Sequence, residues 1–137
     1  MNDSKNKLIT IGITAYNEGL YLQEAWDSVV NQIDDRWKAV LVIDGGADKK
    51  TREILDNIVD KSLTKVVLDK NYGPYYSRTV AINNTKTDWY CHLDGDDRLP
   101  KDFTSLILET LKDKPNADLI YGDIQYIKNN KKTIKKN

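Results

Sequence analysis

The stretch LITIGI at residues 8–13, which runs directly into Thr14-Ala15-Tyr16-Asn17, decides the fold of this chain. A short run rich in β-branched residues before polar ones predicts a strand that ends in a loop, with Asn17 as the cap of a following helix. Apolar side chains then recur at spacings of three and four, which predicts one buried helix face made by Leu22, Trp26, Val29, Val30 and Ile33.

The same alternation of strand and helix continues along the chain. Residues 39–43 form a nearly continuous apolar run, typical of a strand covered on both faces. Asp48 can cap a helix whose predicted buried stripe is Ile54, Leu55, Ile58 and Val59. Further segments are predicted as strands at 64–68, 89–93 and 119–127 and as helices at 75–84 and around 106–111. Short connections between alternating strands and helices predict a mostly parallel sheet in a three-layer α/β/α sandwich.

The composition is that of a globular domain without a net basic character. The 137 residues carry 21 Lys plus Arg and 21 Asp plus Glu, a formal net charge of 0. This balance argues against nucleic acid as the main partner, because binding to phosphates requires a basic face. Residues 128–137 hold five lysines and no acid, so residues 1–127 carry −5 (0 − 5). We predict one α/β domain over residues 1–127 and a basic, flexible tail over residues 128–137.

Cys91 is the single cysteine of the chain, which excludes an internal disulfide framework and a cysteine-based zinc cluster. No apolar run approaches the roughly 18 residues that a membrane span requires, and no signal-peptide core follows the start. We therefore expect no integral membrane segment and a cytoplasmic location. A homo-oligomer is compatible with the sequence.

Three polar loops follow strands of the predicted sheet. Their sequences are TAYNE at 14–18, DGGAD at 44–48 and DGDD at 94–97. Ligands of open parallel sheets bind beyond the carboxyl ends of the strands. The sequence therefore predicts a site where these acidic and amide side chains converge.

Asp94, Asp96 and Asp97 place three carboxylates within four residues. Such charges repel one another unless a cation lies among them. Mg²⁺ or Mn²⁺ is held by one or two carboxylates, with water and substrate phosphates completing its shell, so a short acidic turn suffices. The competing interpretation is an acidic surface turn before Pro100.

Other candidate residues each have a structural alternative. Asp44 can accept hydrogen bonds from a base or ribose, or can simply begin a glycine turn. Arg78 has the fork geometry that suits a diphosphate, or is a solvated helix residue. His92 is more typical of a packed, hydrogen-bonded strand residue than of a ligand. Three aromatic side chains can stack on a base or pack at the sheet edge: Tyr72, Tyr75 and Tyr76.

The motifs taken in order are IGITAYNE at 11–18, VIDGGAD at 42–48, NYG at 71–73 with Arg78, and LDGDD at 93–97. This combination resembles the nucleotide-sugar-binding half of family-two glycosyltransferases of the GT-A fold. The similarity spans about residues 7–127, with YGD at 121–123 in the expected place. It implies a Rossmann-like GT-A sandwich that stops before the acceptor-binding half.

The resemblance also implies roles for individual residues. The loop that contains Thr14, Ala15, Tyr16 and Glu18 would line the uridine pocket, Asp44 would contact the nucleoside, and Arg78 would lie near the donor. Asp96 matches the residue that meets Mn²⁺ or Mg²⁺ and the diphosphate, while Asp94 is placed toward the ribose or sugar. Asp97 would support the metal.

The chain departs from the family pattern in several places. Ile43 stands where an additional acid is common, Gly46 and Ala47 stand where serine and threonine are usual, and Ser77-Arg78-Thr79 replaces the frequent Ala-Arg-Asn. The family's catalytic base is an acidic residue of the acceptor half, and no residue of this chain is assigned that role.

We therefore predict a metal-dependent, inverting glycosyltransferase or its donor-binding half, which takes a nucleotide-diphospho-sugar, most readily a UDP-sugar. Two other classes stay open. One is a non-catalytic nucleotide-sugar-binding module. The other is a metal-dependent phospho- or nucleotidyl-transfer enzyme, although the chain has no Gly-x-x-x-x-Gly-Lys phosphate loop.

Overall fold

The computed structural model describes residues 8–129 and 131–136, and the chain divides into two compact units, residues 1–105 and 106–137. The predicted domain start and parts of the predicted tail, residues 1–7, 130 and 137, lie outside the described residues. The elements in chain order are β1 (Ile9–Ala15), α1 (Leu20–Val30), β2 (Trp37–Ile43), α2 (Lys49–Asn57), β3 (Leu63–Val67), α3 (Pro74–Asn83), β4 (Trp89–Asp94), α4 (Phe103–Asp113), β5 (Ile124–Lys128) and β6 (Lys131–Lys135).

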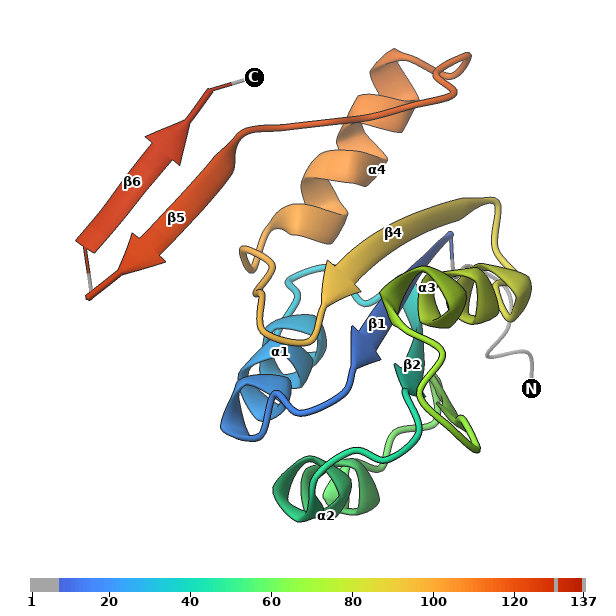
Figure 1. The fold of residues 1–137 in the computed structure, drawn as a ribbon. Helices are drawn as coiled ribbons and strands as arrows, with labels where there is room; N and C mark the ends of the chain where they lie inside the picture. The colour runs from blue at the N-terminus through green and yellow to red at the C-terminus, as the bar shows by residue number, and fades with distance from the viewer. Residues whose placement is uncertain (1–7, 130, 137) are drawn as a thin grey trace. The chain divides into compact units, whose positions relative to one another are not determined.

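The first unit is built on a four-stranded parallel sheet of order β3-β2-β1-β4. β1 lies between β2 and β4, and all seven of its residues are buried. Helix α3 covers one side of β1 and β2, and α1 and α2 lie on the other side (Figure 1). The predicted parallel α/β/α architecture is therefore confirmed.

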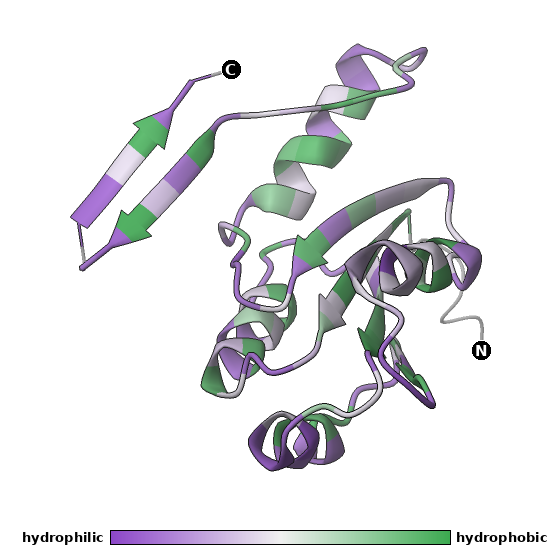
Figure 2. Cartoon of the chain, viewed as in Figure 1, coloured by the Kyte–Doolittle hydropathy of each residue, from purple (hydrophilic) through white to green (hydrophobic). Residues whose placement is uncertain are grey.

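Strand alternation divides the residues of the sheet between its two faces. The α3 face carries Val40 and Val42, which pack with Ala81 of α3. Figure 2 shows that β1 and β2 carry much of the apolar sequence of this unit. Because side chains alternate along a strand, the register of β1 with β4 puts Thr14 opposite Asp94, on the same face as His92. This face therefore carries polar groups next to its apolar core.

Two predicted helix details differ in the structure. Asn17 does not cap α1: Gly19, with φ 56°, precedes the helix, and Asn17 Oδ1 instead accepts from the Asp48 backbone N–H at 2.7 Å. Asp48 does cap α2, because its carboxylate accepts from the Thr51 N–H at 2.7 Å. Three residues of the predicted buried stripes are exposed, because Val30 is the last residue of α1 and Ile33 and Val59 lie beyond the ends of α1 and α2.

The second unit contains most of α4 and a two-stranded antiparallel hairpin of β5 and β6. The sequence predicted a strand over 119–127 and a basic, flexible tail over 128–137. The strand begins at Ile124 instead, and Lys131–Lys135 pairs with it as β6. Asn129 turns the chain with φ 49°, and the pair Tyr126–Thr133 supplies side chains that favour strands. The domain boundary at residue 127 stays a prediction.

Within the described ranges, no helix combines the length and apolar character needed to cross a bilayer.

Candidate functional site

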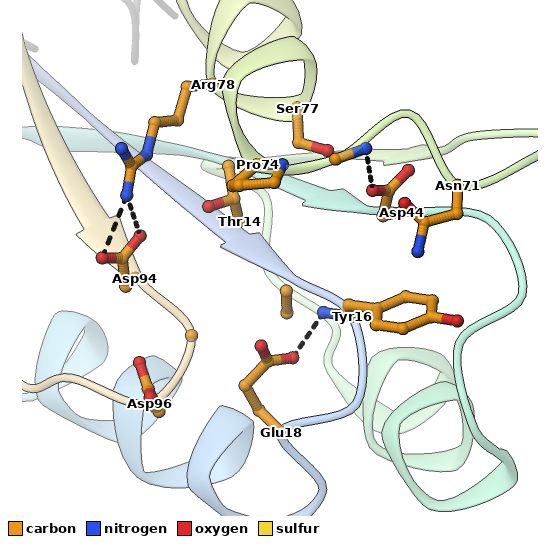
Figure 3. A pocket seen from close by; sticks show the side chains of 13 residues that line it. Thr14, Tyr16, Glu18, Asp44, Asn71, Pro74, Ser77, Arg78, Asp94 and Asp96 are labelled. Carbon is orange, nitrogen blue, oxygen red and sulfur yellow. Dashed lines mark hydrogen bonds and ion pairs between the residues drawn. The ribbon is translucent and has the colours of Figure 1, made fainter.

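A pocket of about 340 Å³ opens at the carboxyl ends of β1, β2 and β4, where α3 begins. This volume is within the range of small-molecule sites. Its lining residues are Thr14, Ala15, Tyr16, Glu18, Asp44, Asn71, Gly73, Pro74, Ser77, Arg78, Asp94, Gly95 and Asp96. Figure 3 shows Asp94 and Asp96 at one end and Asp44 with Asn71 at the other.

The structure brings together all eight residues that the sequence predicted for nucleotide-sugar binding: Thr14, Ala15, Tyr16, Glu18, Asp44, Arg78, Asp94 and Asp96. Asp97, the third predicted metal residue, is not among the lining residues. Its backbone N–H donates to the Asp94 carbonyl at 2.9 Å, which closes the acidic turn. The grouping places the candidate residues in one pocket, and their individual roles stay predictions.

Asp44 is held by backbone hydrogen bonds at one end of the pocket. It is 4% exposed, and its carboxylate accepts three backbone hydrogen bonds. Oδ1 receives the N–H groups of Gly45 at 3.1 Å and Tyr72 at 2.8 Å, and Oδ2 receives that of Gly73 at 2.7 Å. Asp44 thus ties the loop after β2 to the loop that leads into α3.

Gly45 is needed for the close packing of two backbone segments. A Cβ at this position would lie 2.3 Å from the backbone N of Lys70, and the Gly45 N–H donates to the Lys70 carbonyl at 3.1 Å. Gly95 has a similar role at the other end, where a Cβ would lie 2.8 Å from the Ala15 Cβ and 2.9 Å from the Thr14 carbonyl oxygen. Both glycines allow the loops to approach each other.

Arg78, His92 and Asp94 form a hydrogen-bonded cluster at the opposite end. Arg78 Nη2 donates to Asp94 Oδ1 at 2.8 Å and to Oδ2 at 3.1 Å. Arg78 Nε lies 3.0 Å from His92 Nε2, and that same nitrogen lies 2.7 Å from Asp94 Oδ1. His92 therefore accepts from Arg78 in one tautomer and donates to Asp94 in the other. The predicted hydrogen-bonded role of His92 agrees with this geometry.

The pKa values of two acids in this region move in opposite directions. Burial would raise the pKa of Asp94, but hydrogen bonds from Arg78 and His92 outweigh burial and hold it below its ordinary value. Partial desolvation raises the pKa of Asp97, and the charges of Asp96 and Asp94 add to that rise. The negative charge of Asp94 is therefore stabilised by its hydrogen-bond donors, whereas the negative charge of Asp97 is disfavoured.

The charges of the pocket fit a divalent cation that arrives together with an anionic ligand. Four carboxylates and one guanidinium line it, a formal charge of −3 (+1 − 4). Within the described residues, no three His, Cys, Asp or Glu side chains form a preassembled metal group. One or two carboxylates suffice for Mg²⁺ or Mn²⁺ when phosphate oxygens complete the shell. The exposed carboxylate of Asp96 meets that requirement.

The first loop of the pocket is fixed by its own residues and by the second loop. The Glu18 carboxylate accepts from the Tyr16 backbone N–H, and the Gly19 N–H donates to Thr51 Oγ1 at 2.9 Å. Together with the bond between Asn17 and Asp48, these contacts join the loops after β1 and β2. The Glu18 and Tyr16 side chains both line the pocket.

Sequence reasoning did not assign Asn71 and Ser77 to the site. Asn71 lies in a loop whose position depends on the Asp44 contacts, which the sequence pattern does not reveal. Ser77 precedes the predicted Arg78 by one residue in the first turns of α3. The spacing of the helix could have revealed Ser77. Residues four apart lie on the same face of a helix, and Ser77 follows Gly73, which also lines the pocket, by four positions.

Comparison with known proteins is consistent with this geometry. The family described as glycosyl transferase family 2 matches residues 10–137, almost the whole described chain. The chain belongs to glycosyl transferase family 2.

The similarity of this family 2 chain to individual proteins is moderate. It is 30% identical over 107 residues to a teichoic acid poly(glycerol phosphate) polymerase of Staphylococcus epidermidis, covering 76% of the chain and 15% of that protein. The family 2 chain therefore spans a small part of this relative's length.

Two solved structures share the GT-A fold with this family 2 chain. One is S. aureus TarS 1–349 in complex with UDP-GlcNAc, with a TM-score of 0.71 and 22% identity over 77% of this chain and 31% of that chain. The other is the mannosyltransferase PcManGT from Pyrobaculum calidifontis in complex with GDP-Man and Mn²⁺, with a TM-score of 0.66 and 20% identity over 91% of this chain and 36% of that chain. The predicted GT-A class of the sheet is therefore confirmed.

Proposed function

We propose that this chain binds the nucleotide-diphospho-sugar donor of an inverting glycosyltransferase, with a UDP-sugar as the preferred donor and Mn²⁺ or Mg²⁺ as cofactor. The observation that carries the proposal is the pocket itself. It places a buried carboxylate, Asp44, at one end and an acidic turn with Arg78 at the other. Support also comes from the family and from structural neighbours whose titles name UDP-GlcNAc, GDP-Man and Mn²⁺.

The polar groups suggest how the donor would lie. Asp44 would accept an N–H of the nucleoside, and Thr14, Ala15, Tyr16 and Glu18 would enclose the base and ribose. Asp96 would hold the cation with the diphosphate oxygens, while Asp94 would face the ribose or sugar and Asp97 would support the metal. Arg78 would keep the Asp94 carboxylate oriented through its paired hydrogen bonds.

The transfer step follows from this arrangement. An acceptor hydroxyl would attack the sugar carbon, giving its proton to a carboxylate base that no residue of this chain is assigned to supply, while the bond from the sugar to the nucleoside diphosphate breaks in line. The cation, when bound, neutralises charge on the departing diphosphate. Arg78 and the acidic turn would hold the leaving group on the side of the sugar away from the acceptor. The acceptor is unspecified by the residues of this pocket.

Binding measurements on the purified chain test the proposal. Isothermal titration with UDP, GDP and their sugar conjugates, with Mn²⁺ and with EDTA, should show binding that weakens at least about tenfold without metal. Asp96→Ala should weaken binding similarly, whereas Asp56→Ala, which removes an exposed acid from α2, should not. UDP binding that ignores both metal and Asp96, or no nucleotide binding at all, would contradict the proposal.

Turnover separates the proposed enzyme from the two alternatives. Binding without sugar transfer or donor hydrolysis would favour a non-catalytic nucleotide-sugar-binding module. Metal-dependent cleavage of nucleotides regardless of the sugar would favour a phospho- or nucleotidyl-transfer enzyme. Transfer that requires the sugar-linked diphosphate supports the glycosyltransferase.

A cytoplasmic location and self-association complete the proposal. Cys91 is a free thiol, and burial raises its pKa to about 11, which keeps it protonated and unreactive at neutral pH. A free thiol suits a reducing compartment. A homo-oligomer stays a prediction, which sedimentation of the purified chain would test.

A further inference from the structure

Ser77 has an unusual environment for a hydroxyl. Its residue is 2% exposed, and Oγ has no hydrogen-bond partner in the part of the chain that the structure describes. A serine inside a helix commonly bonds back to the carbonyl four residues earlier. Here the Gly73 carbonyl accepts the Ser77 backbone N–H at 3.2 Å, and the Ser77 hydroxyl makes no bond to it. An unpartnered buried hydroxyl destabilises a protein, so its presence in a pocket wall indicates a ligand.

The position of Ser77 specifies which part of a ligand it would meet. Ser77 lines the same pocket as Asp44, and both are bonded to Gly73: the Gly73 N–H donates to Asp44 Oδ2 at 2.7 Å, and the Gly73 carbonyl accepts from Ser77. Figure 3 shows Ser77 on the α3 side of the pocket, above Asp44 and far from Asp96. Ser77 therefore belongs to the end that would receive the nucleoside.

The Asp44 carboxylate and the Ser77 hydroxyl each keep an unused hydrogen-bonding site, and together these sites match one kind of nucleobase edge. A carboxylate offers about four acceptor sites. Two on Asp44 Oδ1 are used by Gly45 and Tyr72, and one on Oδ2 by Gly73, which leaves a site on Oδ2. The Ser77 hydroxyl can donate. An acceptor beside a donor pairs with a ring N–H beside a carbonyl, as in uracil or guanine.

We propose that Ser77 is a specificity-determining residue that donates a hydrogen bond to the nucleobase carbonyl next to the N–H bound by Asp44. This inference rests on the proposed function. It excludes cytosine and adenine, whose ring nitrogen at the corresponding position accepts a hydrogen bond and whose neighbouring group is an amino donor. The Asp44 carboxylate, which can only accept, rejects bases that present the reverse pattern, and the Ser77 hydroxyl adds affinity for the carbonyl beside the ring N–H.

Ser77→Ala tests the assignment, with Thr104→Val as matched control. Thr104 is also buried with an unpartnered hydroxyl in the described part of the chain, but does not line the pocket. Titration with UDP, CDP, GDP and ADP in Mn²⁺ should show that Ser77→Ala weakens UDP binding about threefold to tenfold and leaves CDP binding unchanged. Thr104→Val should preserve all four affinities. Neither variant should lower the melting temperature of the unliganded protein, because each removes an unsatisfied group.

The outcomes separate this inference from the proposed function. A loss confined to GDP would support the assignment with guanine as the base. Metal-dependent UDP binding that is equal in the wild type and in Ser77→Ala would overturn the role of Ser77 and leave the donor site standing. A wild type that binds no nucleotide would overturn both. An equal loss for UDP and CDP would show that Ser77 only shapes the pocket, which also overturns the inference.

Discussion

Asp44 and Asp94 lie at two ends of one pocket, yet they are held in different ways. Asp44 is 4% exposed and receives backbone N–H groups of Gly45, Tyr72 and Gly73. The Asp94 side chain is 42% exposed and is held by the side chains of Arg78 and His92. One carboxylate is part of the backbone framework, and the other belongs to a side-chain cluster.

Because of this difference, we expect Asp44 to contribute mainly to folding stability and Asp94 to respond mainly to a bound ligand. The partners of Asp44 cannot move without opening the loops after β2 and before α3. The partners of Asp94 are side chains that can rotate when a cation or diphosphate enters. We therefore expect substitution of Asp44 itself to destabilise the protein strongly, and substitution of the side chains around Asp94 to act mainly on binding and titration.

Asp44→Ala should have the largest effect on stability. Removing the carboxylate leaves three buried or half-buried backbone N–H groups without their acceptor, which should lower the free energy of unfolding by about 3–5 kcal/mol. Urea unfolding at pH 7 measures the change. Asp96→Ala, an exposed acid at the other end, should stay within about 0.5 kcal/mol of the wild type. Similar midpoints for both variants would remove the distinction between the two ends.

Alanine substitutions at Gly45 and Gly95, one glycine at each end of the pocket, should have the next largest effect on stability. In Gly45→Ala the new Cβ meets the Lys70 backbone at 2.3–2.4 Å, which should destabilise by about 2–3 kcal/mol. In Gly95→Ala the nearest atom is the Ala15 Cβ at 2.8 Å, and about 1–2 kcal/mol is expected. Thermal unfolding of both variants ranks them. A larger loss for Gly95→Ala would mean that the acidic turn is the more rigid end.

The fold and the meeting of three polar loops at one edge of the sheet could be predicted because both depend on local patterns, whereas the roles of single residues came from the family resemblance and stay predictions. Short apolar, β-branched runs for strands, apolar spacings of three and four for helices and polar loops at strand ends are visible in the residue order. The parallel register then brings the loops after β1, β2 and β4 together. No homologous structure is needed to infer that convergence from alternating elements.

The details that the sequence did not predict depend on contacts distant in the chain. Two of the three partners of Asp44 lie 28 and 29 positions later in the chain, and Asn17 bonds Asp48 instead of capping α1. The solitary hydroxyl of Ser77 is likewise a property of three-dimensional packing. Propensity gives the candidates for a cap or a ligand, but only the packed structure decides which partner each group receives.

Arg78→Gln tests the side-chain end by titration. Because the pKa of Asp94 is held below its ordinary value of 3.8, its ionised form stabilises the folded state above that pH, and this contribution is lost as pH falls through the lower folded value. Arg78→Gln removes the main opposing interaction, so the Asp94 midpoint should rise. The free energy of unfolding at pH 7 should fall by about 0.5–1 kcal/mol, since both side chains are partly exposed.

Carboxyl carbon resonances of Asp94, followed by NMR in the wild type and in Arg78→Gln, measure that midpoint. Arg98→Gln is a matched control, because Arg98 pairs with Glu24 on α1 instead. An Asp94 midpoint that is the same in all three proteins would show that Arg78 does not set its ionisation.

Asp97→Asn should have the smallest effect, and one of opposite sign. Partial desolvation and the charges of Asp96 and Asp94 raise the pKa of Asp97, so its ionised form disfavours the folded state at neutral pH and this penalty disappears as pH falls below 3.8. The neutral variant should gain a few tenths of a kcal/mol at pH 7 and nothing near pH 3. Added Mn²⁺ should reverse the order, because a bound cation favours the charged turn. Urea unfolding at both pH values measures the gain. If Asp97→Asn instead destabilises the protein at pH 7, the acidic turn is held by fixed donors as Asp44 is, and both ends of the pocket are built in advance of the ligand.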